Sequence, residues 1–379
     1  MKRHTIAPRP DWRARVEAQG LLFHSVSATD EPQRYWAEGT YYELSAPEVE
    51  AIEAATDELH DMCLEAAQHV IDRGRYAELG IPARAIPLIE RTWEAEPPSI
   101  YGRMDFALPP GGVPKLLEYN ADTPTSLLEG SVIQWTWLED CFPALDQFNS
   151  IHDRLIAHWA ELREHLDGPI AHFGCVDDLE DAMTIGYLRD TATQAGLVTV
   201  GIDMEDIGWD EAAQHFLDLE NQPIRNLFKL YPWEGLITDD FAPMIERAPA
   251  VRWMEPAWKM LISTKGILPI LWELFPDHPN LLPASFAQPA AGGWVKKPLH
   301  GREGSNVTIA APGIDVASGG PYDAEGFVYQ TYADLGSYDG MRPVIGSWLI
   351  GGQSAGMGIR ETPGYITNNT ACFAPHVIR

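Results

Sequence analysis

The fold can be argued from one segment of the chain, Tyr101-Gly-Arg-Met-Asp-Phe-Ala-Leu-Pro-Pro-Gly-Gly-Val-Pro-Lys-Leu-Leu-Glu-Tyr-Asn-Ala-Asp122. The prolines and glycines at positions 109–114 break any helix and favour a reversal, so two short strands joined by a turn are predicted. Because side chains alternate across a strand, Arg103 and Asp105 should share one face of the first strand.

The return strand carries two further polar side chains on one face, Glu118 and Asn120, and we expect Leu117 and Tyr119 on the other. If the hairpin closes, three oxygen ligands and one guanidinium gather in a small patch. Oxygen ligands suit Mg²⁺ better than zinc, which prefers His and Cys. An alternative stays open, because a solvated strand whose charges pair with one another shows the same alternation.

The composition excludes several classes of partner. The chain has 379 residues, which is enough for two or three closely packed lobes. Its formal net charge of −28 repels nucleic acid and anionic lipid, so we expect no nucleic-acid partner and no membrane partner. The four cysteines lack metal-ligand spacing and the N-terminus lacks an apolar leader. Reduced thiols and a cytoplasmic location are therefore expected.

Outward from the hairpin, the pattern predicts an α/β (α+β) fold. Ser45 is a candidate cap for a helix that extends to about Arg73. A buried-type strand over 170–176, a helix over 181–195 and a strand over 197–202 follow in order. Strands that alternate with helices in this way favour a parallel sheet.

An acidic turn, Asp177-Asp-Leu-Glu-Asp181, lies at the C-terminal end of the strand over 170–176. Open α/β sheets bind ligands at this end of their strands. Acidic residues are also favoured at a helix N-terminus by the helix dipole, so this simpler interpretation stays open as well.

A glycine-rich loop, Gly301-Arg-Glu-Gly-Ser305, follows Lys297. Free backbone amides beside a lysine are suited to a polyphosphate. The order of a Walker A loop is absent, so a P-loop kinase is disfavoured. A glycine-rich hairpin tip without a ligand is the alternative.

Two further cations have open roles. Lys265 could contact phosphate, or it could be a solvated lysine at a helix end. Arg360 has glycine and small neighbours that leave room for a ligand, so it could clamp a carboxylate or phosphate or pair with a nearby acid.

Taken in order, these motifs resemble the synthetase domain of the glutathionylspermidine synthase family. The resemblance extends from about Tyr35 to the C-terminus, is most specific over Leu116–Glu129, and is strongest to stand-alone acid–amine ligase-like members. It implies an ATP-grasp-like ligase in circularly rearranged order. Residues 1–250 would form a pre-ATP-grasp lobe, which includes the metal-binding hairpin over 100–122, and residues 251–379 the nucleotide-binding lobe.

The resemblance also implies roles for individual residues. It assigns Asp105, Glu118 and Asn120 to the metal, Arg103, Arg302 and Arg360 to catalysis, Lys265, Lys297, Gly301, Gly304, Tyr329 and Gln330 to the nucleotide, and Thr123, Thr125, Ser126, Asp178, Glu180 and Asp181 to the substrates. The acidic residues among the last set resemble the family's polyamine-binding cluster. One departure is the turn over 123–126, where the family's synthase has a serine-rich turn ending in Cys, so glutathione as the acid is in doubt.

The resulting hypothesis is an ATP- and Mg²⁺-dependent carboxylate–amine ligase that forms an amide through an acyl phosphate. Its partners would be a small-molecule acid and an amine, the latter a polyamine or another basic amine. Two alternatives stay open: a nucleotide-binding protein of the same fold without turnover, and a metal-dependent hydrolase that uses no nucleotide. No oligomeric state is predicted.

Overall fold

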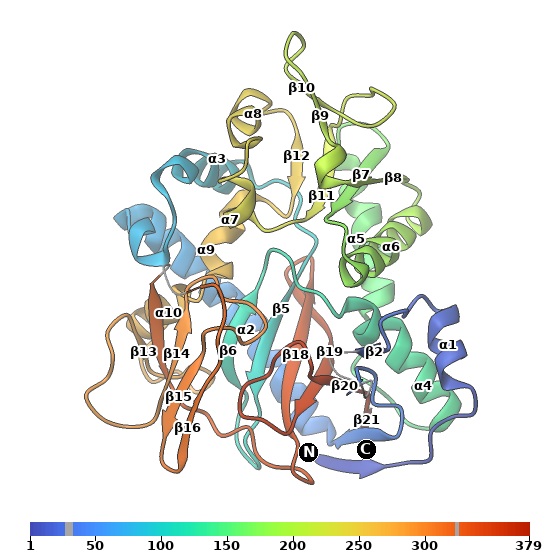
Figure 1. Cartoon of the computed structure of the whole chain (residues 1–379), viewed down its shortest axis with the longest axis vertical. Helices are drawn as coiled ribbons and strands as arrows, with labels where there is room; N and C mark the ends of the chain where they lie inside the picture. The colour runs from blue at the N-terminus through green and yellow to red at the C-terminus, as the bar shows by residue number, and fades with distance from the viewer. Residues whose placement is uncertain (27–32, 323–325) are drawn as a thin grey trace.

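The computed structural model describes residues 1–26, 33–322 and 326–379. It is a mixed α/β structure with three larger sheets (Figure 1). The central antiparallel sheet has the order β20 (Cys372–Ala374), β19 (Gln353–Thr362), β18 (Arg342–Ile350), β5 (Tyr101–Ala107) and β6 (Lys115–Asn120). The predicted hairpin is thus confirmed as β5 and β6, at one edge of this sheet.

The second sheet is also antiparallel and lies beside the hairpin (Figure 1). Its order is β13 (Ala284–Ser285), β17 (Phe327–Thr331), β14 (Trp294–Pro298), β15 (Thr308–Ala311) and β16 (Ile314–Ala317). The glycine-rich loop connects β14 to β15. Lys297, the last residue but one of β14, therefore lies shortly before the loop.

The third sheet is parallel, as the βαβ pattern predicted. Its order is β12 (Arg252–Met254), β11 (Asn226–Leu230), β7 (Ile170–Cys175) and β8 (Val198–Asp203). Helix α6 (Leu179–Gln194) connects β7 to β8. The acidic turn lies where β7 ends and α6 begins.

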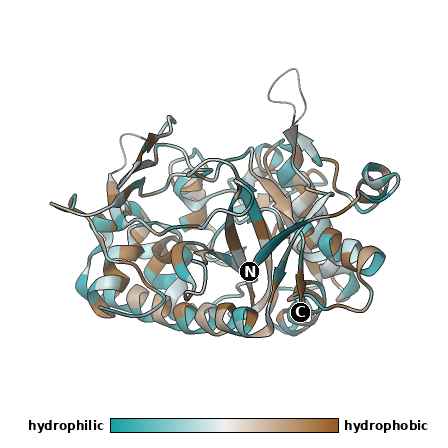
Figure 2. Ribbon diagram, turned by 90° about the horizontal axis from the view of Figure 1, so that it is seen from below, coloured by the Kyte–Doolittle hydropathy of each residue, from teal (hydrophilic) through white to brown (hydrophobic). Residues whose placement is uncertain are grey.

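Smaller elements complete the fold. β1 (Lys2–Thr5), β4 (Thr40–Leu44) and β21 (His376–Ile378) form a sheet that brings both termini together (Figures 1 and 2). The short hairpins are β2 (Ser25–Val26) with β3 (Gln33–Arg34) and β9 (Gly208–Asp210) with β10 (His215–Leu217). The other helices are α1 (Trp12–Ala18), α2 (Ala46–Arg73), α3 (Ile86–Ala95), α4 (Gln134–Cys141), α5 (Ile151–Leu162), α7 (Trp233–Leu236), α8 (Ala242–Arg247), α9 (Met260–Ser263) and α10 (Ile267–Leu274).

The long helix α2 packs across the central sheet, on the face away from the polar residues of the hairpin. Ser45 and Glu48 form the predicted capping box at its start, and Gly74 ends it in a left-handed conformation with φ 64°. A hydrogen bond of 2.7 Å between Thr56 Oγ1 and Ser347 Oγ joins the helix to β18. The helices show hydrophilic and hydrophobic residues along their length (Figure 2), as expected for helices with one face on the core.

The central sheet joins segments from both predicted lobes, because β5 and β18 pair along their length although some 240 residues separate them. The boundary near residue 250 stays a prediction. Among the described residues, none of the helices has the length and apolar character needed to cross a bilayer.

Candidate active site

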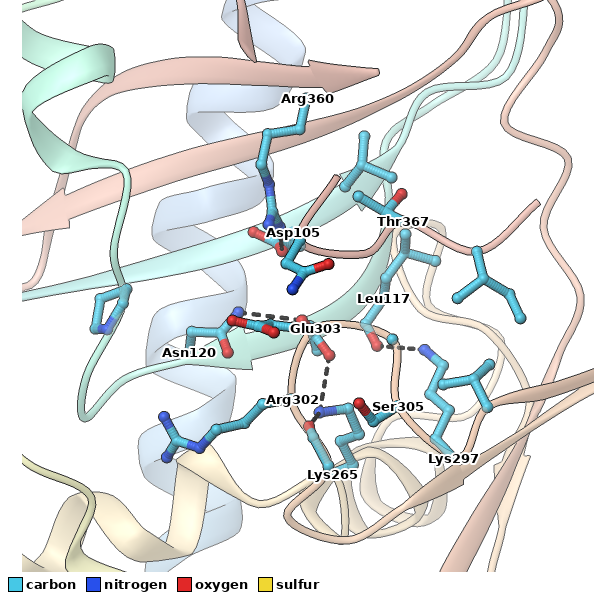
Figure 3. A pocket seen from close by; sticks show the side chains of 18 of the residues that line it. Asp105, Leu117, Asn120, Lys265, Lys297, Arg302, Glu303, Ser305, Arg360 and Thr367 are labelled. Carbon is cyan, nitrogen blue, oxygen red and sulfur yellow. Dashed lines mark hydrogen bonds and ion pairs between the residues drawn. The ribbon is translucent and has the colours of Figure 1, made fainter. Parts of the chain in front are cut away.

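A cavity of about 640 Å³ lies where the three sheets meet (Figure 3). Its walls come from the hairpin, β14 and β17, the glycine-rich loop, the carboxyl ends of β7 and β11, and the segment around residue 366. All the residues predicted for the site line this cavity, with two exceptions, Ser126 and Tyr329.

Neither exception faces the cavity, although both lie next to residues that do. Ser126 is buried, and its hydroxyl lies 3.0 Å from the Tyr35 hydroxyl. The Tyr329 ring packs edge-on against Trp294 with centroids 5.5 Å apart. Because side chains alternate along β17, Gln330 points into the cavity when Tyr329 points away from it.

The two strands of the hairpin are in the register that places the polar residues together. Arg103 pairs with Asn120, and Asp105 pairs with Glu118. The register then shifts, so that Leu117 is an extra residue in β6. Our expectation that Leu117 opposes Glu118 was wrong, because this bulge lets the Leu117 side chain line the cavity too.

Asp105 lies between two guanidinium groups. Arg103 Nε donates to Asp105 Oδ1 at 2.6 Å, and Arg360 Nη2 donates to Oδ2 at 2.8 Å. Arg103 also donates to the backbone oxygen of Thr125 at 2.7 Å, which connects the hairpin to the predicted substrate turn. Charge-assisted bonds of this length orient all three groups. Arg360 thus pairs with an acid while it lines the cavity, so both of its predicted roles remain compatible.

Glu118 is held by an ammonium group and an amide. Lys265 Nζ lies 2.9 Å from Glu118 Oε2, and Asn120 Nδ2 donates to Oε1 at 3.2 Å. Burial raises the pKa of the Glu118 carboxyl, but the charges of Lys265 and Lys297 outweigh burial and lower the pKa below its usual range. Glu118 is therefore an anion at any physiological pH. Lys265 is only 9% exposed, so it is not a solvated lysine at a helix end.

The donor set of the hairpin fits a hard divalent cation. Two carboxylates in direct cross-strand register would repel one another without positive charge between or beside them. Here arginines and a lysine supply that charge, and Asn120 offers an amide oxygen. The described residues include no group of three or more His, Cys, Asp or Glu side chains placed to hold a metal. A cation at this position would thus use two carboxylates and the amide.

Lys297 is 8% exposed and reaches the cavity beside the hairpin. Its Nζ donates to the backbone oxygen of Leu117 and to Gln330 Oε1, each at 2.8 Å. The bulge makes the Leu117 oxygen available for this bond. Burial lowers the pKa of Lys297 to about 8; Glu118 opposes the shift and Lys265 adds to it.

This lowered pKa predicts proton uptake when a polyphosphate binds. Below about pH 8 the lysine is already charged, and above it the free protein holds a neutral amine that must be protonated to bind phosphate. ATP affinity should therefore fall as the pH rises through 8. Calorimetry at pH 9 in two buffers of different ionisation enthalpy should show uptake of up to one proton. Lys297→Arg should show none, and equal uptake in both proteins would contradict the assignment.

The glycine-rich loop is tied to both sides of the cavity. Lys265 Nζ donates to the Gly301 oxygen at 2.6 Å. Arg302 binds Glu234 Oε1 at 2.7 Å and Thr123 Oγ1 at 2.8 Å. At Gly304, with φ 67°, an added Cβ would lie 2.6 Å from a backbone oxygen of the neighbouring segment, so only glycine fits.

Sequence reasoning missed the apolar part of the cavity and a segment near the C-terminus that also lines it. Val295, Ile309, Leu335 and Val344 form a hydrophobic wall with Leu117, and the C-terminal segment contributes Tyr365, Ile366, Thr367 and Asn369. One signal was available, because Val295 and Lys297 are two residues apart and must share a face of β14. A hydrophobic slot beside cationic groups suits a flat base attached to phosphates.

The opposite part of the cavity is acidic. Asp178 caps α6, since its Oδ1 accepts the backbone N–H groups of Glu180 at 2.9 Å and Asp181 at 3.2 Å. The simpler interpretation of the turn as a helix N-terminus is thus confirmed, yet all three side chains also line the cavity. Burial, together with the charges of Asp178 and Glu180, raises the pKa of Asp181 to about 7. The cavity therefore combines the cations around the hairpin with the carboxylates of this turn, which we call its acidic end.

Comparison with known sequences and structures places the chain among ligases and synthetases. It matches the family described as glutathionylspermidine synthase preATP-grasp over residues 3–379. A protein of Haemophilus influenzae named as an acid–amine ligase is 41% identical, and the match covers 99% of each chain. A trypanothione synthetase of Crithidia fasciculata is 32% identical over 84% of this chain and 53% of the relative.

Two further relatives extend the comparison. The bifunctional glutathionylspermidine synthetase/amidase of Escherichia coli is 27% identical over 89% of this chain and 59% of its own length. The chain thus spans little more than half of the two synthetases. A glutathione synthetase-like effector of Globodera pallida, solved without ligand, has the same fold, with a TM-score of 0.59, 9% identity and coverage of 99% of this chain and 100% of that one. The match over residues 3–379 makes this chain a member of the glutathionylspermidine synthase preATP-grasp family.

Proposed function

We propose that the protein is an ATP- and Mg²⁺-dependent ligase that joins a small carboxylic acid to an amine through an acyl phosphate. The relatives are named as ligases and synthetases, which supports an ATP-dependent carbon–nitrogen ligase. The observation that carries the proposal is that one cavity is lined by three kinds of group. These are a hydrophobic wall, cations around paired carboxylates, and an acidic turn.

Each group of residues would bind one part of the substrates. The hydrophobic wall and Gln330 would hold the adenine of ATP, while Lys265, Lys297 and the loop amides would hold its phosphates. Asp105, Glu118 and Asn120 would hold Mg²⁺, which when bound neutralises charge on the phosphate oxygens. Arg103 and Arg360 would stabilise the charge that develops during phosphoryl transfer.

Water would hydrolyse an acyl phosphate, and the loop over 301–305 would exclude water from it. Its hydrogen bonds to Lys265, Thr123 and Glu234 support this role, since they fix the loop against the cavity that it lines. We further propose that residues 251–379 contribute the nucleotide-binding lobe, in the circularly rearranged order of an ATP-grasp ligase.

The identity of the acid is the least constrained part of the proposal. The turn Thr123-Pro-Thr-Ser126 carries hydroxyls and no thiol. Two of its backbone oxygens are held, that of Pro124 by the Tyr101 hydroxyl at 3.0 Å and that of Thr125 by Arg103. A fixed turn with two threonine side chains in the cavity would select the acid by hydrogen bonding.

A screen of substrates tests the proposed function. Mg-ATP should raise the melting temperature of the protein, and ADP release should require one acid and one amine together. The panel would include glutathione, other small acids, polyamines and neutral amines. A thermal shift without ADP release under any pair would instead support a nucleotide-binding protein without turnover. Metal-dependent hydrolysis without any thermal shift from ATP would support the hydrolase.

The acidic end predicts the class of amine. Changing Glu180→Gln and Asp181→Asn together should raise KM for a polyamine or other basic amine on the order of tenfold, since each lost contact is worth about 1 kcal/mol or more. Affinity should also fall as salt rises. ATP binding should not change, because neither side chain is among the residues assigned to the nucleotide or the metal.

The matched control is Asp177→Asn, which removes a charge from the same turn at an exposed side chain that does not line the cavity. It should leave KM for the amine unchanged. An unchanged KM in the double variant, or a preference for neutral or acidic amines, would leave the turn as a helix N-terminus only. The ligase proposal would survive that result.

A further inference from the structure

Glu303 has no role in the function proposed so far, although it lies within the glycine-rich loop motif. Its side chain lines the cavity, and Figure 3 shows it directed into the space between the hairpin and the loop. Its backbone is left-handed with φ 50°, which is unfavourable for a residue with a side chain. Among the described residues, its carboxylate has neither a hydrogen bond nor an ion pair.

Charges of both signs surround Glu303. Glu180 and Asp178 approach it from α6, and Arg302 and Arg360 approach it from the loop and from β19. Neither arginine is free to neutralise it, because Arg302 is bound to Glu234 and Arg360 to Asp105. Burial, followed by repulsion from Glu180, raises the pKa of Glu303 despite the two arginines.

The proposed reaction requires a base at such a position. An alkylamine bound by carboxylates is an ammonium ion, since amines of this kind have a pKa of about 10. An ammonium nitrogen has no lone pair and cannot attack. Asp105 and Glu118 are already held by cations, and Asp178 is used as a helix cap. Glu180 and Asp181 are the groups proposed to hold the ammonium ion. Glu303 lines the same cavity, close enough to interact with Glu180 and with Arg360.

We propose that Glu303 is the general base that deprotonates the attacking amine; this inference rests on the proposed ligase function. One ammonium proton passes to a Glu303 carboxylate oxygen, and the freed lone pair forms the carbon–nitrogen bond to the acyl carbon. The bond from that carbon to the phosphate oxygen breaks, and its electron pair leaves with the phosphate. The phosphate takes up the second nitrogen proton, and Glu303 returns its proton to solvent.

The position of Glu303 on the loop links the base to the exclusion of water. Glu303 is in position only while the loop lines the cavity, where its hydrogen bonds to Lys265 and Glu234 hold it. An open loop would remove the base and the cover together. Activation of the amine would thus be linked to exclusion of water from the acyl phosphate.

Hydroxylamine tests the assignment, because it is uncharged at neutral pH and needs no base. In the wild-type protein, ATP, Mg²⁺ and the acid found in the screen should yield a hydroxamate with hydroxylamine, or the amide with the basic amine. Glu303→Gln should lower kcat for the amide about 10²–10⁴-fold. It should change the rate of hydroxamate formation by less than about threefold. Glu303→Asp should recover part of the amide rate.

Each other outcome overturns the assignment in a distinct way. An equal loss of both products in Glu303→Gln would place Glu303 in phosphoryl transfer, and no loss of either would remove it from the reaction. A raised KM for the amine at unchanged kcat would make it a binding residue, the behaviour expected of Glu180→Gln. If the wild-type protein forms no hydroxamate from any acid, the proposed function itself fails. Melting temperatures of all Glu303 variants should match within a few degrees, because the Glu303 carboxylate makes no hydrogen bond or ion pair with the described residues that a substitution would remove.

Discussion

Glu118→Gln and Asp105→Asn are each expected to lower metal-dependent turnover on the order of 10³-fold. Each change replaces a charged oxygen ligand with a neutral amide of the same shape. The two carboxylates are in direct register across the hairpin, so a cation bound between them loses half of its anionic ligands. Steady-state ADP release, measured while Mg²⁺ is titrated, should show that higher metal concentrations recover little of the activity.

The two variants should differ in stability. Asp105 neutralises Arg103, which is only 7% exposed, and Arg360. Asp105→Asn leaves two adjacent guanidinium groups without an anion, so a lower melting temperature is expected. Glu118→Gln leaves Lys265 with its second partner, the Gly301 oxygen, and should be milder.

Glu361→Gln provides the matched control for this experiment. Glu361 follows Arg360 in β19 and is as buried as Asp105, but it binds Arg3 and Tyr42 outside the cavity. Its loss should lower the melting temperature and leave kcat of the folded protein unchanged. Near-normal turnover in a folded protein that carries both hairpin changes would contradict the metal assignment.

Lys297→Ala is expected to weaken ATP binding about 10- to 150-fold, which corresponds to about 1.5–3 kcal/mol for a charge-assisted hydrogen bond. Lys297 is the buried cation next to the hydrophobic wall, so little solvent screens its interaction with phosphate. Removal also leaves Gln330 Oε1 and the Leu117 oxygen without this donor. Calorimetric titration with Mg-ATP measures the change.

Lys296→Ala is the control for Lys297→Ala. Lys296 precedes it in β14 and faces the other side, where its ammonium lies 3.6 Å from the centroid of the Phe327 ring. Both variants lose one positive charge from the same strand. Equal affinity for ATP in the two variants would show that only general electrostatics, and no phosphate contact, had been removed.

Local signals were enough to predict the elements that carry the site. The turn residues of 109–114 predicted the hairpin, and the alternation around Arg103 and Asp105 predicted its polar face correctly. The capping box at Ser45 and the βαβ pattern over 170–202 were also confirmed. Each of these depends on interactions between residues close in sequence, which is why the chain alone reveals them.

Other features depend on residues far apart in the chain. The bulge at Leu117 arises from pairing between strands and has no mark of its own in the sequence. Tyr329 and Gln330 were predicted together, but only the position of β17 beside Trp294 decides which of them faces the cavity.

The sequence by itself determined the local elements of this protein, the residue types of the site and, through its motifs, the family. Only the tertiary structure decided which charged side chains form ion pairs. Lys265 pairs with Glu118, and Arg360 pairs with Asp105. Glu303 interacts with Glu180 and Arg360, which are distant from it in the chain. The physical reason is that Coulomb interactions and burial depend on distance in space. Spacing along the chain specifies that distance only within a helix, a strand or a tight turn.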